Sequence, residues 1–219
     1  KLKKGGSFGD IYGKAFKRDT DGKILYETDG ERQGLPMIEG DGNTVKVGNA
    51  NPDFTLGWTN TFSWKGLVLS LLVDGRYGGK VLSQTQADMD MYGVTKVTGD
   101  ARDRGYVMLE GEKITNVKGF YKSIVEGRAG GTEYYMYDAT NFRLRELALG
   151  FTFPKRWMEA TKFFRDVQLA FTARNLFFIY KKAPFDPDLI LSTGNDNQAI
   201  EVYGMPTTRS MGFSLRVMF

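Results

Sequence analysis

The chain lacks the two side chains that most often carry out chemistry in enzymes. Among its 219 residues there is no histidine and no cysteine. Histidine is the commonest general base and metal ligand, and cysteine supplies thiolate nucleophiles and disulfides. Their absence argues against a hydrolase triad and against most metalloenzymes. The formal charge of +4 is mild and its basic residues are spread along the chain, so nucleic-acid binding is not predicted.

Carboxylates do occur close together in sequence, as acid–base pairs need in space. The pairs are Asp186 with Asp188, Asp88 with Asp90, and Glu110 with Glu112. Turn chemistry explains them better than catalysis does. A cluster of Asp19, Asp21 and Gly22 is weakly similar to a calcium loop, but no spaced glutamate follows it. We therefore expect no enzymatic activity, no cofactor and no metal site.

Binding is the better interpretation of one group of aromatic and polar side chains. Tyr134, Tyr135 and Tyr137 lead into Asp138 and Asn141. Aromatic rings beside carboxylates and amides can stack on sugars or peptides and hydrogen-bond to them. The alternative is that the tyrosines form an interfacial belt or pack the loop in which they lie. The sequence leaves both interpretations open for this candidate substrate-binding set.

Five segments of period-two alternation must position these residues. Each has apolar side chains on one face and small or polar ones on the other, which is typical of a β-strand with one lipid-like face. The segments are 54–64, 67–77, 142–153, 166–174 and 208–219, with a tight turn at Lys65-Gly66. Residues 154–164 begin with a proline and are predicted to form a short helix. The long stretches 78–140 and 175–207 are predicted to be loops.

One of these strands breaks its own alternation. Phe142 and Leu144 fall on the polar side, and Arg143 and Arg145 fall on the apolar side. One account is a bulge at Arg145-Glu146. The other places the arginines outside the hydrocarbon layer, in contact with lipid head-group phosphates. The sequence does not choose between them.

The strands have the length that a membrane requires, since a tilted strand crosses the hydrocarbon layer in about 9–11 residues. If the chain ends on the periplasmic side, both long loops lie outside the cell and the tight turn lies inside. Aromatic residues then gather at both boundaries, as in the girdles of outer-membrane barrels. They are Trp64, Phe153 and Phe219 on the inner side, and Phe54 and Tyr77 on the outer side. The alternative is a soluble, secreted β-sandwich that binds glycans.

The number of strands limits what the chain can be. An open sheet edge cannot face lipid, because its unpaired backbone groups are costly there. Known single-chain bacterial barrels use even numbers of strands, from about eight upward. We therefore expect an all-β fold, a transmembrane antiparallel β-barrel to which this chain contributes about five or six strands with long extracellular loops.

Several short motifs follow one another between about Gly9 and Phe219. They are Ile11-Tyr12-Gly13, 19–22 (DTDG), 48–54 (GNANPDF) with Trp58, Asn60 and Phe62, 74–79 (DGRYGG), 137–146 (YDATNFRLRE) with Leu149-Gly150-Phe151, 173–177 (ARNLF) and 185–188 (FDPD). Each motif is weak alone, but their order and spacing make the set specific. Together they resemble the C-terminal barrel portion of the SusC/RagA family of TonB-dependent outer-membrane transporters of Bacteroidetes.

The resemblance implies that residues 1–219 belong to the barrel domain of a protein with about 22 strands, whose plug and N-terminal strands are absent here. It implies import of glycans or peptides across the outer membrane of a Gram-negative bacterium, with a SusD-like surface lipoprotein as a lid. The TonB complex would act through the missing plug, and lipid and lipopolysaccharide would surround the barrel. Phe219 would serve as a barrel-assembly signal. A passive porin is a further alternative.

Overall fold

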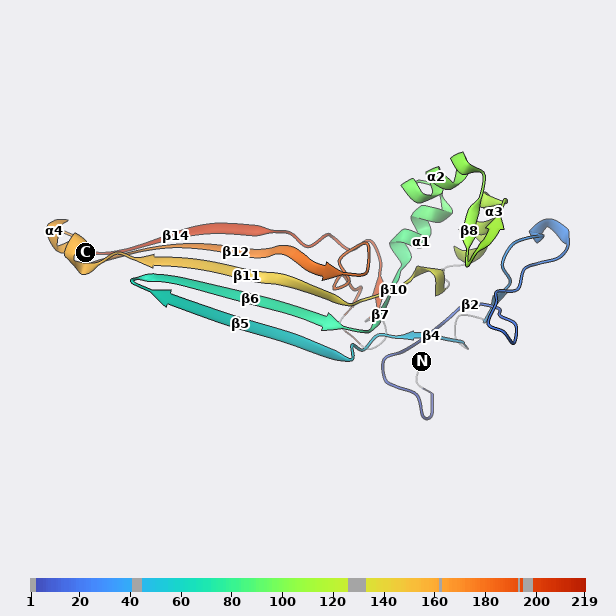
Figure 1. Ribbon diagram of the computed structural model, residues 1–219, viewed down its shortest axis with the longest axis horizontal. Helices are drawn as coiled ribbons and strands as arrows, with labels where there is room; N and C mark the ends of the chain where they lie inside the picture. Colours follow the sequence, from blue (N-terminus) through green and yellow to red (C-terminus); the bar gives the residue numbers. More distant parts are fainter. Residues whose placement is uncertain (1–2, 41–44, 126–132, 162, 193, 195–198) are drawn as a thin grey trace. The chain divides into compact units, whose positions relative to one another are not determined.

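The computed structural model describes residues 3–40, 45–125, 133–161, 163–192, 194 and 199–219, and the chain divides into two compact units (Figure 1). The sheet unit comprises Pro52–Gly78, Ala139–Asp186 and Pro206–Phe219. The mixed unit comprises Lys1–Asn51, Gly79–Asp138 and Pro187–Met205. Each unit is therefore assembled from three segments that are far apart in the sequence.

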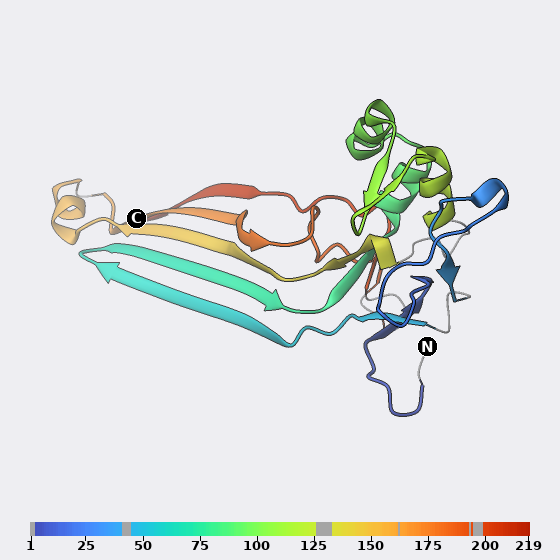
Figure 2. The same cartoon turned by 45° about the vertical axis from the view of Figure 1, so that its right-hand side comes forward.

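The sheet unit is one antiparallel sheet of five strands in the order β14-β12-β11-β6-β5. The strands are β5 (Phe54–Trp64), β6 (Leu67–Tyr77), β11 (Asn141–Thr152), β12 (Asp166–Lys181) and β14 (Ser210–Met218). They run side by side in both views (Figures 1 and 2). These strands occupy the five alternating segments, so the predicted antiparallel β architecture is confirmed. Among the described residues, β5 and β14 each pair on one side only.

The register of the sheet places side chains of one kind in rows. An apolar row crosses all five strands and consists of Phe62, Leu69, Leu149, Phe171 and Phe213. The adjacent row is small or polar and consists of Thr61, Ser70, Ala148, Thr172 and Gly212. Because opposite residues of paired strands point to the same face, the sheet has one apolar and one polar face. The apolar face is exposed, with 79% of Phe213 and 55% of Phe62 accessible.

The broken alternation in β11 is a β-bulge. The register shifts between Leu144 and Glu146 against both β6 and β12. Against β6, Arg145 is the extra residue, which places Leu144 opposite Val73 on the apolar face and Arg143 opposite Asp74 on the polar face. Of the two accounts that the sequence left open, the structure has the bulge.

The short connections lie at one end of the sheet. Lys65 and Gly66 form the predicted tight turn, and both have the positive φ (46° and 89°) that two-residue hairpins need. Gly66 is required because a Cβ there would lie 2.6 Å from the carbonyl oxygen of Thr152. The predicted short helix is α4 (Lys155–Thr161), which joins β11 to β12 at the same end. The long connections, β6 to β11 and β12 to β14, therefore both leave the opposite end.

Aromatic rings gather at both ends of the sheet, as predicted. Where the long connections leave, Phe54 stacks on Tyr77 with ring centroids 5.3 Å apart. At the other end, the ring centroid of Phe219 lies 5.1 Å from that of Phe163 and 5.7 Å from that of Phe164. Two groups of rings therefore bracket the strands.

One predicted strand boundary is wrong. The sequence predicts a loop from Asn175 onward, but β12 continues to Lys181. Asn175 has a φ of 52°, in the left-handed region that asparagine tolerates better than most residues. The strand therefore passes through one irregular residue and then resumes, which hides its second half from a search for unbroken alternation.

The mixed unit contains helices and short strands, so the prediction that residues 78–140 form only a loop is wrong. The strands pair as β1 (Asp10–Gly13) with β4 (Val45–Asn49), β2 (Ala15–Phe16) with β3 (Ile38–Glu39), β8 (Val107–Leu109) with β9 (Glu112–Ile114), and β7 (Lys80–Ser83) with both β10 (Met136–Asp138) and β13 (Ile200–Glu201). The helices are α1 (Gln84–Met91), α2 (Lys96–Arg104), α3 (Val117–Val125) and the single turns η1 (Gly30–Arg32) and η2 (Glu133–Tyr135). None of the described helices is long and apolar enough to cross a membrane.

Local signals explain where the helices of the mixed unit begin and end. The hydroxyl of Thr95 accepts the backbone N–H of Thr98 at the start of α2, and Gly105 ends that helix with a φ of 77°. α3 supplies much of the core, since Phe120 and Ile124 are at most 1% exposed. Burying each of these side chains contributes about 1.5–3 kcal/mol.

Candidate functional site

Charged side chains meet on the polar face of the sheet unit in a group that we call the arginine cluster. Its members are Asp74, Arg143, Arg145, Asp186 and Thr207. Arg145 Nε donates to Asp74 Oδ2 at 2.6 Å, and Arg143 Nη1 donates to Asp186 Oδ2 at 3.3 Å. Arg143 Nε lies 3.5 Å from Asp74 Oδ1, and the Thr207 hydroxyl donates to Asp186. Two guanidinium groups are thus matched by two carboxylates.

The arginine cluster fastens the strands to the connection that follows β12. Arg143 is 2% exposed and its guanidinium lies 4.8 Å from the ring centroid of Phe178 in β12. Arg145 donates to Asn175 Oδ1 at 3.1 Å, and Asn175 donates to the carbonyl of Thr208 at 3.2 Å. Buried ion pairs of this kind fix the relative positions of their side chains, because burying either charge without its partner would cost free energy. The arginines therefore hold protein groups together on the polar face.

The three candidate tyrosines lie in the mixed unit. Tyr135 is completely buried in the core. Tyr134 is partly buried, with its ring edge-on to Phe120 at 5.6 Å and to Tyr135 at 5.1 Å between centroids. Tyr137 is half-buried in β10, where burial raises its pKa to about 12. The packing interpretation therefore holds for Tyr135, whereas part of the Tyr137 side chain stays exposed to solvent.

A buried carboxylate, Asp90, lies in the same unit and is 3% exposed. Its Oδ1 accepts hydrogen bonds from the Thr95 hydroxyl at 2.6 Å and the Gln86 amide at 2.8 Å. Burial raises the pKa of Asp90 despite these bonds. Burial and, secondly, the charge of Asp90 raise the pKa of Tyr134 and Tyr135. The tyrosines are therefore held as neutral phenols.

The remaining candidates are divided between the two units. Asp138 ends β10 in the mixed unit and is partly buried. Asn141 begins β11 in the sheet unit, is 1% exposed and donates its amide to the carbonyl of Ala139 at 3.0 Å. Phe219 is exposed beside the aromatic group at the end of the sheet. Ligand binding by the candidate set and an assembly role for Phe219 stay predictions.

Several carboxylates of the pairs identified in the sequence form hydrogen bonds or ion pairs with other side chains. The Tyr203 hydroxyl donates to Asp88 at 2.8 Å, and Arg18 donates to the two oxygens of Glu110 at 2.8 and 2.7 Å. Asp186 belongs to the arginine cluster. Within the part of the chain that the structure describes, no three acidic side chains gather as metal ligands do. These carboxylates therefore have structural partners in the described residues.

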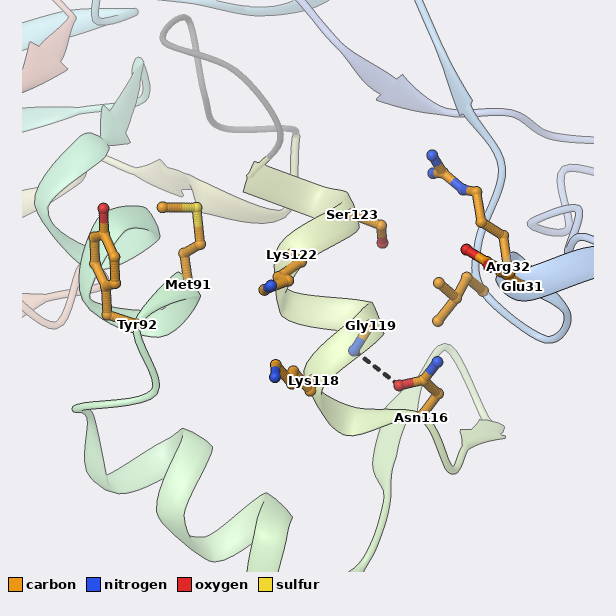
Figure 3. Close-up of a pocket in the computed structure, with 10 residues that line it drawn as sticks. Glu31, Arg32, Met91, Tyr92, Asn116, Lys118, Gly119, Lys122 and Ser123 are labelled. Carbon is orange, nitrogen blue, oxygen red and sulfur yellow. Dashed lines mark hydrogen bonds between the residues drawn. The ribbon is translucent and has the colours of Figure 1, made fainter.

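A hollow of about 800 Å³ lies in the mixed unit and is not predicted by the sequence analysis (Figure 3). α3 runs between the Met91 end of α1 and the turn that carries Arg32. Lys118 and Lys122 lie one above the other along this helix. Asn116 Oδ1 caps the start of α3 by accepting the backbone N–H of Gly119 at 2.9 Å. We call this cavity the basic hollow.

The basic hollow combines a cationic rim with an apolar floor. Among the described residues that line it, Arg32, Lys118 and Lys122 are accompanied by one carboxylate, Glu31, so these side chains together carry an excess of positive charge. The floor includes Leu35, which is 3% exposed, and Met91, which packs against the core. The i, i+4 spacing of the two lysines could have signalled this face, but no helix was predicted there.

A second, smaller hollow adjoins the first. It has a volume of about 190 Å³ and shares Met91, Tyr92 and Lys118 with the basic hollow. Its lining adds Arg102 and Tyr121. Tyr92 is 76% exposed and so stands at the rim that the two hollows share. The two hollows therefore offer one extended surface with a further positive charge.

Comparison with known proteins agrees with the motifs in the sequence. No protein-family model matches the chain. The TonB-dependent receptor P3 of Formosa agariphila is 23% identical over 236 residues, covering 100% of this chain and 23% of that protein. The TonB-dependent receptor P39 of the same organism is 23% identical over 182 residues, covering 82% of this chain and 17% of that protein. The chain thus spans less than a quarter of the length of these relatives.

The fold matches solved structures of RagAB. The peptide importer in its open-open state aligns with a TM-score of 0.60 and 14% identity, covering 96% of this chain and 22% of the RagAB chain. The closed-closed state gives 0.54 and 13%, with 95% and 22% covered. The RagAB peptide transporter gives 0.55 and 15%, with the same coverage. The predicted resemblance agrees with these findings: this chain is similar in sequence to part of TonB-dependent receptors and has the fold of part of the RagAB transporter.

Proposed function

We propose that this chain is part of an outer-membrane transporter that is energised by TonB and imports peptides or glycans. The chain contributes wall strands and the structure that connects them. The complete protein carries out the transport, so uptake, substrate and partners are properties of the longer molecule.

The two-faced sheet carries this proposal. Its apolar row is exposed, as a lipid-facing surface must be, and its polar face carries small side chains and the arginine cluster. Alternation of this kind is what a barrel needs between lipid and a polar lumen. Both long connections leave one end of the sheet, which supports an extracellular position for them.

The substrate and the partners are proposed by similarity. Peptide import by RagAB supports peptides as one substrate class for this protein, and the sequence resemblance supports glycans as the other. The resemblance also supports a SusD-like surface lipoprotein as the lid and the TonB complex as the energy source. The exposed apolar face supports contact with lipid and lipopolysaccharide.

Uptake by cells tests the proposal. In a strain that lacks the full-length gene, plasmid-borne receptor should restore uptake of a labelled peptide or glycan mixture, and deletion of TonB should abolish it. An affinity tag on the receptor should retain a surface lipoprotein after detergent extraction. The matched control is a receptor without its plug residues.

Two results would overturn the proposal. Uptake that persists without TonB would favour the passive porin. Full-length protein found in the soluble secreted fraction without detergent would favour the glycan-binding β-sandwich instead.

A further inference from the structure

The basic hollow is lined by two lysines that do not stabilise the helix on which they lie. Lys118 and Lys122 are separated by one turn of α3 and both are exposed. Like charges at this spacing destabilise a helix by about 0.2–0.5 kcal/mol. Among the described carboxylates, none is paired with either lysine. The two charges therefore face solvent together and are available to a ligand.

Charge across the hollow has the same sign. Arg32 lines the basic hollow from η1, and Arg102 lines the adjoining hollow from α2. Glu31 is the one carboxylate among the described residues that line the basic hollow, and Asp90 in the adjoining hollow is buried and bonded to Thr95. Several cations around one concavity attract an anionic ligand and raise its local concentration.

The apolar residues of the hollow indicate which class of anionic ligand it would bind. Met91 on one side of α3 and Leu35 on the other give the hollow apolar lining, onto which aliphatic side chains can pack. Sugars bind instead by stacking on aromatic faces, and within the described part of the lining Tyr92 is the one aromatic residue. A ligand that carries carboxylates beside apolar side chains matches both the rim and the floor.

We infer that the basic hollow binds acidic peptide segments, with carboxylates against Lys118 and Lys122 and apolar side chains against Met91 on one side of α3 and Leu35 on the other. This inference rests on the proposed function, because it names the kind of peptide that the transporter would select. The adjoining hollow extends the site for longer peptides, with Tyr92 at the shared rim.

Equilibrium binding to the full-length receptor in detergent tests the inference without any need for transport. The probe is a fluorescein-labelled pentapeptide that alternates glutamate with leucine, and its partner has glutamine at each glutamate. We expect the glutamine peptide to bind at least about tenfold more weakly, and the difference to shrink at high salt because exposed charges are screened.

Substitutions that reverse the charge of the two lysines test whether binding occurs at the basic hollow. The double variant K118E/K122E should lose at least about tenfold in affinity for the acidic peptide, since two attractive pairs become repulsive. K118R/K122R should retain it. The matched control, K96E/K113E, makes the same charge change on exposed lysines of the mixed unit that do not line the hollow, and should retain it too.

Each result of the peptide comparison and of the variants either supports or overturns the inference. Equal binding of the two peptides by wild-type receptor would overturn the inference, and so would equal losses in K118E/K122E and K96E/K113E. The peptide comparison uses unaltered receptor and so does not depend on how any variant folds. A receptor that imports substrate through TonB yet ignores peptide charge would refute the inference and leave the transport function standing.

Discussion

Arg143 shows how one residue depends on its neighbours. It is 2% exposed, and its charge is balanced by Asp186 and Asp74. Removing a guanidinium from water costs several kcal/mol unless such partners are present. Asp186 also accepts the Thr207 hydroxyl, so one carboxylate serves both a strand and the segment that leads into β14.

Asp186→Asn should therefore lower the free energy of unfolding of the sheet by about 3 kcal/mol, because it removes a buried countercharge. The matched control is Glu146→Gln, whose ion pair with Arg174 is largely exposed and worth about 0.2–1 kcal/mol. Urea titrations of the full-length barrel, followed by gel mobility without heating, measure both. Equal effects would contradict the assigned role of Asp186.

Asp90 makes the mixed unit sensitive to pH. Its pKa is raised in the folded state, so folding favours the protonated carboxyl. Its contribution to stability is therefore full at acidic pH and is lost as pH rises through the raised pKa. Asn at this position keeps an oxygen for Thr95 and Gln86 without the buried charge. At about pH 7, Asp90→Asn should slow amide exchange in α1 and α2, and at about pH 3 it should match wild type.

Hydrogen exchange with mass spectrometry on the full-length receptor makes this comparison at equal pH. The exchange of β12 amides in the sheet unit serves as the internal control. Faster exchange of α1 in the variant at neutral pH would show that the charged form of Asp90 is favoured by its hydrogen bonds.

At the scale of the element, the bulge in β11 decides which side chains lie on the apolar face of the sheet. Arg145 is an extra residue in the strand, and because the bulge sets it outside the register with β6, Leu144 stays on the apolar face and Arg143 on the polar face. A shift of one residue moves every side chain beyond it to the other face. The bulge therefore lets one strand carry Leu144 on the apolar face and Arg143 on the polar face.

Deleting Leu144 should prevent assembly of the barrel, because it places an arginine on the apolar face: Arg143 if the bulge is kept, and Arg145 if the bulge is lost. An arginine facing lipid costs about 2–4 kcal/mol at the bilayer midplane and less near its surface. Arg145→Ala keeps the residue count and should assemble. Outer-membrane fractionation and heat-dependent gel mobility distinguish the two, and normal assembly of the deletion would exclude the register argument.

The elements differ in how far the sequence predicts them. Alternation located the five long strands, because each has one apolar and one polar face. It failed at Asn175, where a left-handed residue interrupts β12. It also missed α1, whose sequence QTQADMDM has no apolar stripe, although Thr95 and Gly105 mark the ends of α2 as ordinary caps do.

The candidate site was harder to predict than the strands. Tyr134, Tyr135 and Tyr137 were recognisable as a group, but burial of Tyr135 follows from its place in a core formed by distant segments, which no local pattern contains. The basic hollow joins residues about 90 positions apart, from η1 to α3. Such a cavity depends on tertiary packing, so spacing along the chain cannot reveal it.

At the scale of the whole molecule, the two faces of the sheet should respond oppositely to one substitution. Leu149 lies in the central apolar row and Thr172 in the adjacent polar row. Leu149→Arg should destabilise the inserted barrel by about 2–4 kcal/mol, because the charge faces lipid. Thr172→Arg should be tolerated, because its side chain faces the polar side.

Outer-membrane abundance and urea resistance of the full-length variants check this pair. If Thr172→Arg fails and Leu149→Arg is tolerated, the assignment of the faces is inverted. If both are tolerated, the apolar face does not contact a bilayer.

The assembly of the mixed unit from three distant segments has a consequence for the order of folding. β7 pairs with β13, and Ser83 donates to Glu201 at 2.7 Å across 118 positions of sequence. Contacts of such long range require closure of a large loop, which slows their formation. During synthesis the mixed unit cannot be completed until residues 199–205 have emerged, after β5, β6, β11 and β12. The mixed unit can therefore be completed only after the segments that form these four strands have been synthesised.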